Sequence, residues 1–193
     1  MIQMKWLPGA AMLALFLTAT PAAAEPAPGF DCAMRVFPAE ARTRFRQAYS
    51  EGGLNAALPV LVDPALVQRL AVCVPANAPD TRERGRVLGR AVAANEIMGA
   101  ARASLTTRWR MDAAALERAS AGLSGADRTV IAAGVAEGAS TQAMEAMQAP
   151  VLRFVGVALP GMNMALLHAQ PALALDVFAY VSSRATIDSM EGR

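Results

Sequence analysis

The sequence predicts an all-α protein, folded as one compact bundle of six to eight helices. Aromatic residues make up only 5% of the chain and runs of β-branched residues are few, which argues against a sheet. Pro, Asp and Ser recur at places where helices begin, and Gly recurs where they end. Between these signals, apolar residues return at steps of three and four, as on one face of a helix. After an N-terminal leader, residues 25–193 have a length typical of a single domain.

The first 24 residues are expected to be a cleaved signal peptide. Lys5 gives the polar start its positive charge, residues 9–19 form an uncharged apolar run, and Ala22–Ala24 offer the small side chains that signal peptidase requires. The apolar run is about half the roughly 20 residues of a membrane span, which favours release over an uncleaved anchor helix. We therefore expect a mature chain that begins at Glu25 and is periplasmic or secreted.

Two helices are predicted before residue 75. Pro38 opens the stretch "PAEARTRFRQAY", and Gly52–Gly53 is expected to close that helix. In "DPALVQRLAVC", Asp63 has the position of an N-cap and Pro64 that of the first helical residue. The N-terminal segment that carries Cys32 is expected to be extended.

The longest helix is predicted over residues 80–109. Asp80 and Glu83 have the spacing of a capping box, although Asp replaces the usual Ser or Thr. An apolar stripe with alternating steps of four and three runs along this segment. It consists of Val87, Ala91, Ala94, Met98, Ala101 and Leu105.

Two further helices are predicted in the next stretch. Asp112 begins a short one that ends near Ser120. Ser124 and Asp127 form a second start of the capping-box type. The following segment contains Gly134 and Gly138, and a spacing of four between glycines suggests a close approach by a neighbouring helix.

The C-terminal third is unusually apolar. Pro150 is expected to begin a helix, Pro160–Gly161 interrupts it and Pro171 opens the last helix, so residues 151–181 are cut into pieces too short for a transmembrane span. Three interpretations remain: ordinary core, the face of a homodimer, or a groove for a lipid-like ligand. Adaptable methionines would suit a groove; they are Met144, Met147, Met162 and Met164.

The two cysteines, Cys32 and Cys73, are expected to form a disulfide. An even number of cysteines in an exported chain favours pairing, with two buried free thiols as the alternative. Asp31 precedes Cys32 where lipoprotein processing favours a small residue, which argues against lipidation. The bond would fasten the N-terminal segment to a helix further along the chain.

Charge suggests one candidate binding surface. Arg82, Arg86 and Arg90 repeat every four residues on one helix, and Arg42 and Arg46 form a similar pair on another. If the two helices pack side by side, their guanidinium groups suit anionic components of a cell envelope, such as lipid headgroups. The alternative is a solvated face partly neutralised by acidic neighbours. The formal net charge of +2 is too small to predict nucleic-acid binding.

Catalysis receives less support from the sequence. His168 is the only histidine, which excludes zinc sites that need several histidines, and the chain lacks the familiar hydrolase and nucleotide-binding motifs. We expect neither a metal nor another cofactor. The sequence thus favours an exported binding or assembly protein of the cell envelope. A structural homodimer is one alternative, and an enzyme that uses His168 with Asp176 is the other.

Overall fold

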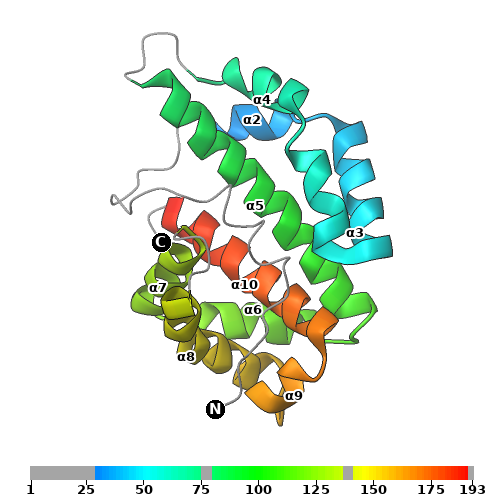
Figure 1. Cartoon of the computed structure of the whole chain (residues 1–193), viewed down its shortest axis with the longest axis vertical. Coiled ribbons are helices and arrows are strands. Elements are labelled where there is room, and N and C mark those ends of the chain that lie inside the picture. The colour runs from blue at the N-terminus through cyan, green and yellow to red at the C-terminus, as the bar shows by residue number, and fades with distance from the viewer. Residues whose placement is uncertain (1–28, 75–79, 137–140, 191–193) are drawn as a thin grey trace.

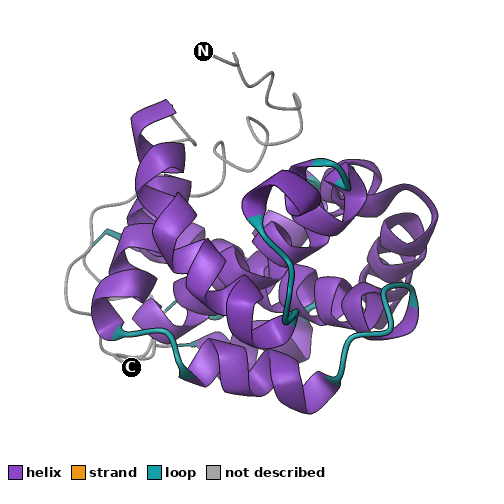
Figure 2. Cartoon of the chain, turned by 90° about the horizontal axis from the view of Figure 1, so that it is seen from below, coloured by secondary structure: helices purple, strands orange, loops and turns teal. Residues whose placement is uncertain are grey.

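The computed structural model describes residues 29–74, 80–136 and 141–190. Every regular element in these ranges is a helix, which confirms the predicted all-α fold (Figure 2). These ranges contain nine helices, because two short ones, Phe30–Val36 and Met164–His168, add to those the sequence predicts. The expected signal peptide, residues 1–24, lies outside the described residues.

Two long helices form the centre of the molecule. α5 (Thr81–Thr107) and α10 (Pro171–Met190) lie against each other, with α2, α3 and α4 on one side and α6 to α9 on the other (Figure 1). Among the described residues, no helix is both long and apolar enough to cross a membrane.

The apolar C-terminal third belongs mainly to the core. Phe154, Val155 and Val177 are almost completely buried in the main apolar cluster, and α10 is buried on several sides. This agrees with the first of the three interpretations of that segment. Leu152 and Val157 of α8 remain partly exposed, at 37% and 48%.

A disulfide joins the two small helices at the N-terminal end. Cys32 on α2 (Phe30–Val36) and Cys73, just beyond α4 (Pro64–Ala71), have their Sγ atoms 2.07 Å apart, which confirms the predicted pairing. The segment that carries Cys32 is helical, whereas the sequence suggested an extended one. Gly29 precedes α2 with φ 96°, and a Cβ there would lie 2.5 Å from the carbonyl oxygen of Cys73. Only glycine fits this approach.

α3 (Ala39–Leu61) is longer than the sequence suggested. It starts after Pro38, but at the expected end it bends at Gly53, whose φ of 70° is not helical, and then continues. The residues after the bend explain the continuation, because Leu54 and Leu58 are buried in the main core. The glycine pair therefore marks a kink, where the sequence pattern predicted an end.

Hydrogen bonds confirm four of the predicted helix starts. Asp63, Asp80 and Asp112 each accept a backbone N–H from the first turn of α4, α5 and α6 (Ala113–Ala121). Ser124 and Asp127 at the start of α7 (Gly125–Ala136) bond reciprocally, each accepting the other's backbone N–H at 3.1 Å. This is the capping box that the spacing predicted.

The prolines of the C-terminal third act in different ways. Pro150 lies inside α8 (Thr141–Ala158), whereas the sequence pattern predicted that it begins a helix. The turn at Pro160–Gly161 separates α8 from α9 (Met164–His168), a short helix that the sequence pattern did not reveal. Its signal is Asn163, whose side chain caps the helix by accepting the N–H of Leu166. Pro171 opens α10 as predicted.

One of the two glycines expected to allow close helix contact does so. Gly134 of α7 is buried, and the sulfur of Met147 on α8 lies only 2.6 Å from where a Cβ of residue 134 would be. A larger residue would force the Met147 side chain to move. Gly138 lies outside the described residues.

An ion pair between α7 and α8 should make stability depend on pH. The Arg153 guanidinium donates hydrogen bonds to Asp127 and holds the pKa of that carboxyl below its usual range. A carboxyl whose pKa is lower in the folded state stabilises the fold at pH values above its unfolded pKa of about 4. This contribution is lost as the pH falls through the folded pKa. We expect Arg153→Gln to reduce stability at neutral pH and to weaken the acid dependence. Urea unfolding of the wild type and of Arg153→Gln at several pH values below about 5 would measure this difference. The same acid dependence in both proteins would contradict this account.

Candidate functional site

A pocket of about 340 Å³ lies between α3 and α5. The two helices run in the same direction here, since Arg42 contacts Glu96 while Tyr49, further along α3, shares a partner with Ser104 of α5. On α5 the pocket is lined by the small residues Gly99, Ala100 and Ala103. A Cβ on Gly99 would meet no atom within 4 Å, so a larger side chain at this position would project into open space.

Two arginines flank the pocket. The side chain of Arg46 on α3 is 60% exposed, with its guanidinium 3.7 Å from an oxygen of the buried Glu96. Arg108 follows the last turn of α5, and its guanidinium lies over the ring of Trp109, 5.0 Å from the centroid. Ser50 and Thr107 add hydroxyl groups to the lining. The pocket thus presents cationic and hydroxyl groups around an apolar floor.

A buried carboxylate beside this pocket organises its wall. Asp176 of α10 is only 5% exposed. One of its oxygens accepts the hydroxyl proton of Tyr49 at 2.9 Å, and the other accepts from Ser104 at 2.6 Å and from the indole N–H of Trp109 at 2.8 Å. The network joins α3, α5, α10 and the segment between α5 and α6. Among the described residues, no ion pair reaches Asp176, so these three donors stabilise its charge.

Tyr49 is held as a hydrogen-bond donor. Its burial, together with the neighbouring charge of Asp176, raises the pKa of the phenol far above its usual range. The phenol therefore stays protonated at any physiological pH. Since an ionised carboxylate can only accept hydrogen bonds, the hydroxyl protons of Tyr49 and Ser104 both point toward Asp176.

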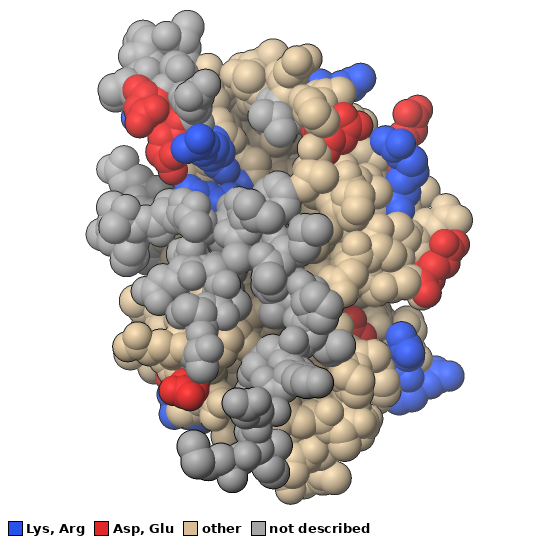
Figure 3. All heavy atoms as spheres, in the orientation of Figure 1, with Lys and Arg blue, Asp and Glu red and all other residues tan. Residues whose placement is uncertain are grey.

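The structure brings the helices of the predicted arginine surface together and pairs several of the arginines with acids. Arg42 donates to Glu96 at 2.7 Å. Arg90, 8% exposed, donates to Glu83 at 3.1 Å, and Arg86 lies 3.5 Å from the same carboxylate. The side chain of Arg82 lies outside the described part. On the described surface visible in Figure 3, basic and acidic atoms occur beside one another in small groups and form no continuous basic field.

Of the predicted arginines whose side chains the structure describes, Arg46 is the one that lines the pocket. Its neighbour Arg42 is half-buried and also lies over the ring of Phe37, 5.6 Å from the centroid. Arg86 is exposed near the start of α5, before the residues that line the pocket. Among the arginines whose side chains are described, the pocket is therefore lined by Arg46 from the predicted set and by Arg108, which the sequence pattern did not select.

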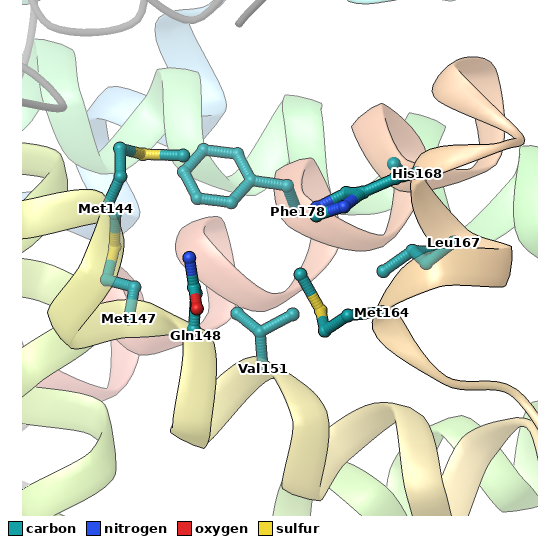
Figure 4. A pocket seen from close by; sticks show the side chains of 9 residues that line it. Met144, Met147, Gln148, Val151, Met164, Leu167, His168 and Phe178 are labelled. Atoms are coloured by element: carbon teal, nitrogen blue, oxygen red, sulfur yellow. The ribbon is translucent and has the colours of Figure 1, made fainter. Parts of the chain in front are cut away.

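The methionine region encloses a second, much smaller pocket of about 50 Å³ between α8, α9 and α10. Met144 and Met147 from α8 lie across it from Met164 and His168 of α9, with Phe178 of α10 at one side (Figure 4). Met162, the fourth predicted methionine, is packed against the core outside this lining. The pocket is apolar and has little room for a lipid-like chain.

The residues of the enzyme hypothesis lie in different settings. His168 lines the apolar pocket, whereas the hydrogen bonds recorded for Asp176 go to Tyr49, Ser104 and Trp109. In the described ranges, no three His, Cys, Asp or Glu side chains gather in a way that could hold a metal ion. The arrangement of Asp176 suits the positioning of other side chains.

No model of a known protein family matches the chain, and neither a curated protein nor a solved structure matches it with statistical significance. Its function must therefore be argued from the geometry of the pocket.

Sequence reasoning missed the Asp176 network, although one signal was present. Asp176 is the only acidic residue between positions 151 and 181, inside an otherwise apolar stretch. A lone carboxylate in such a segment needs buried hydrogen-bond donors. Its partners Tyr49 and Ser104 lie 127 and 72 positions away, so no local pattern identifies them.

Proposed function

We propose that this chain is an exported binding protein of the cell envelope, and that its α3–α5 pocket takes a small anionic ligand. The observation that carries the proposal is that Arg46 and Arg108 both line one hollow of about 340 Å³ with an apolar floor. This volume lies near the lower end of the roughly 300–1,000 Å³ found for small-molecule sites. Guanidinium groups bind carboxylate or phosphate through two parallel hydrogen bonds, which gives such a pocket its preference for anions.

The two arginines differ in the contacts that they would give up on binding a ligand. Arg108 is already ordered by its position over the Trp109 ring, so less side-chain entropy is lost on binding. Arg46 makes the longer contact with Glu96, at 3.7 Å from one carboxylate oxygen. Arg42 makes the shorter contact, at 2.7 Å from the other oxygen. When Arg46 turns toward a ligand, Glu96 keeps its hydrogen bond to Arg42, but its second oxygen, which is buried and accepts no hydrogen bond from the described residues, loses this nearby cation.

Export is supported by the leader pattern and by the Cys32–Cys73 bond, since disulfides persist in oxidising compartments. The test is the mass of the protein recovered from the periplasm or medium of the cells that make it. We expect a chain that begins at Glu25 and loses its disulfide only on reduction. A chain that keeps residues 1–24, or that carries free thiols, would refute export as the setting.

Filling the pocket tests the binding proposal. Gly99→Leu places a side chain in the hollow, whereas Gly156→Leu adds the same side chain on the exposed face of α8; in both places an added Cβ meets no atom within 4 Å. Native mass spectra of gently extracted protein should show a bound small anion on the wild type and on Gly156→Leu. Gly99→Leu should lack it. The same bound species on all three proteins would place the site elsewhere.

If no bound species survives extraction, thermal unfolding with millimolar carboxylates and phosphates replaces the mass measurement. A ligand that binds only the folded state raises the melting temperature. A melting temperature of the wild type that none of these anions raises would refute the anion pocket. The apolar pocket of about 50 Å³ is a weaker candidate for a ligand site because of its size.

A further inference from the structure

The two arginines stand at opposite ends of the α3–α5 pocket. The guanidinium of Arg46 is at the level of Glu96, one turn before Gly99, while Arg108 follows the end of α5. Residues 96 to 108 span about 18 Å along a helix with a rise of 1.5 Å per residue. In this arrangement, one carboxylate or phosphate cannot reach both guanidinium groups.

The middle of the pocket offers hydrogen-bond acceptors. Tyr49 and Ser104 line it, and each donates its only hydroxyl proton in a hydrogen bond to Asp176. Their oxygens keep lone pairs for a ligand but have no proton to give. A ligand in this position is therefore favoured if it carries donors, such as hydroxyl or amide N–H groups, between its ends.

We propose that the ligand is a short dianion with an anionic group at each end and hydrogen-bond donors between them, of the class of hydroxylated α,ω-dicarboxylates. This inference rests on the anion pocket proposed above and narrows its ligand. One end pairs with Arg46 and the other with Arg108. Asp176 acts as a positioning residue, because it fixes the hydroxyls of Tyr49 and Ser104 as acceptors and holds the Trp109 indole beneath Arg108.

Calorimetric titration of the full chain with matched probes tests this. The probes are unbranched dicarboxylates of four to eight carbons, the monocarboxylates of the same lengths, and galactarate, which is adipate with a hydroxyl on each inner carbon. We expect the best dicarboxylate to bind about tenfold or more tightly than its monocarboxylate, and galactarate to bind more tightly than adipate. Hexane-1,6-diol bisphosphate tests whether phosphate ends are preferred over carboxylate ends.

Single substitutions locate the two ends. Arg46→Gln and Arg108→Gln should each reduce the affinity for the best dicarboxylate about tenfold or more, to near that of its monocarboxylate. Arg44→Gln removes an exposed charge from α3 outside the pocket lining and should leave the affinity within about twofold.

The outcomes separate this inference from the broader proposal. Equal affinity for mono- and dicarboxylates would overturn the two-ended ligand and leave the anion pocket standing. Equal affinity for adipate and galactarate would overturn the need for donors in the middle. Binding that Arg46→Gln and Arg108→Gln leave unchanged, or no binding of any of these anions, would overturn both proposals.

Discussion

Replacing Asp176 by Ala is expected to lower the free energy of unfolding by about 4 kcal/mol, a large share of the 5–15 kcal/mol that stabilises a typical domain. The reason is that one substitution removes the partner of three donors, from Tyr49, Ser104 and Trp109. A buried donor without a partner costs about 1–3 kcal/mol, and Ser104 and Trp109, being only partly buried, can recover some of this from water. Loss of the carboxylate also leaves a void where four chain segments meet.

Urea unfolding, followed by circular dichroism, measures this effect. Tyr49→Phe is the matched control, since it removes one hydrogen bond and leaves the other two; it should cost about 1–2 kcal/mol. Asp176→Asn keeps the shape and one acceptor oxygen, so its cost should fall between the two. If Asp176→Ala cost no more than Tyr49→Phe, the three donors would not depend on Asp176.

The all-α fold could be predicted because helix starts are local signals. Asp63, Asp80 and Asp112 each act within the first turn that follows them, so the residues involved are neighbours in the sequence. The bend at Gly53 could not be predicted in the same way. Whether a helix stops or resumes there depends on the burial of Leu54 and Leu58 by other helices.

The pocket could be predicted only in part, because it depends on which distant groups meet. Periodicity correctly placed Arg42 and Arg46 on one helix face, but the neutralising Glu96 lies 54 positions from Arg42. Glu96 falls near the middle of α5 and is 1% exposed, so it can be identified as their partner only after α3 and α5 are placed together. A charge pattern on one helix therefore predicts an anion site poorly until its counter-charges are known.

Breaking the disulfide is the second change with a large expected effect. The double variant Cys32→Ala/Cys73→Ala should lose about 4 kcal/mol of unfolding free energy, because the bond closes a loop across a sequence separation of 41 and restricts the unfolded chain. The folded state should change little, since α2 and α4 keep their own apolar cluster against α5. That cluster includes Ala33, Phe37, Leu66, Leu70, Leu88 and Val92.

Urea unfolding of the wild type with and without reductant, beside the double variant, measures this effect. Reduced wild type should match the double variant, and reductant should not affect the variant. In the reduced wild type and in the double variant, hydrogen exchange should show the fastest opening in α2 and α4, near the two cysteine positions. The central helix α10 should keep its protection. If reduction left the unfolding midpoint of the wild type unchanged, the α2–α4 packing alone would hold the N-terminal end in place, and the bond would add no stability there.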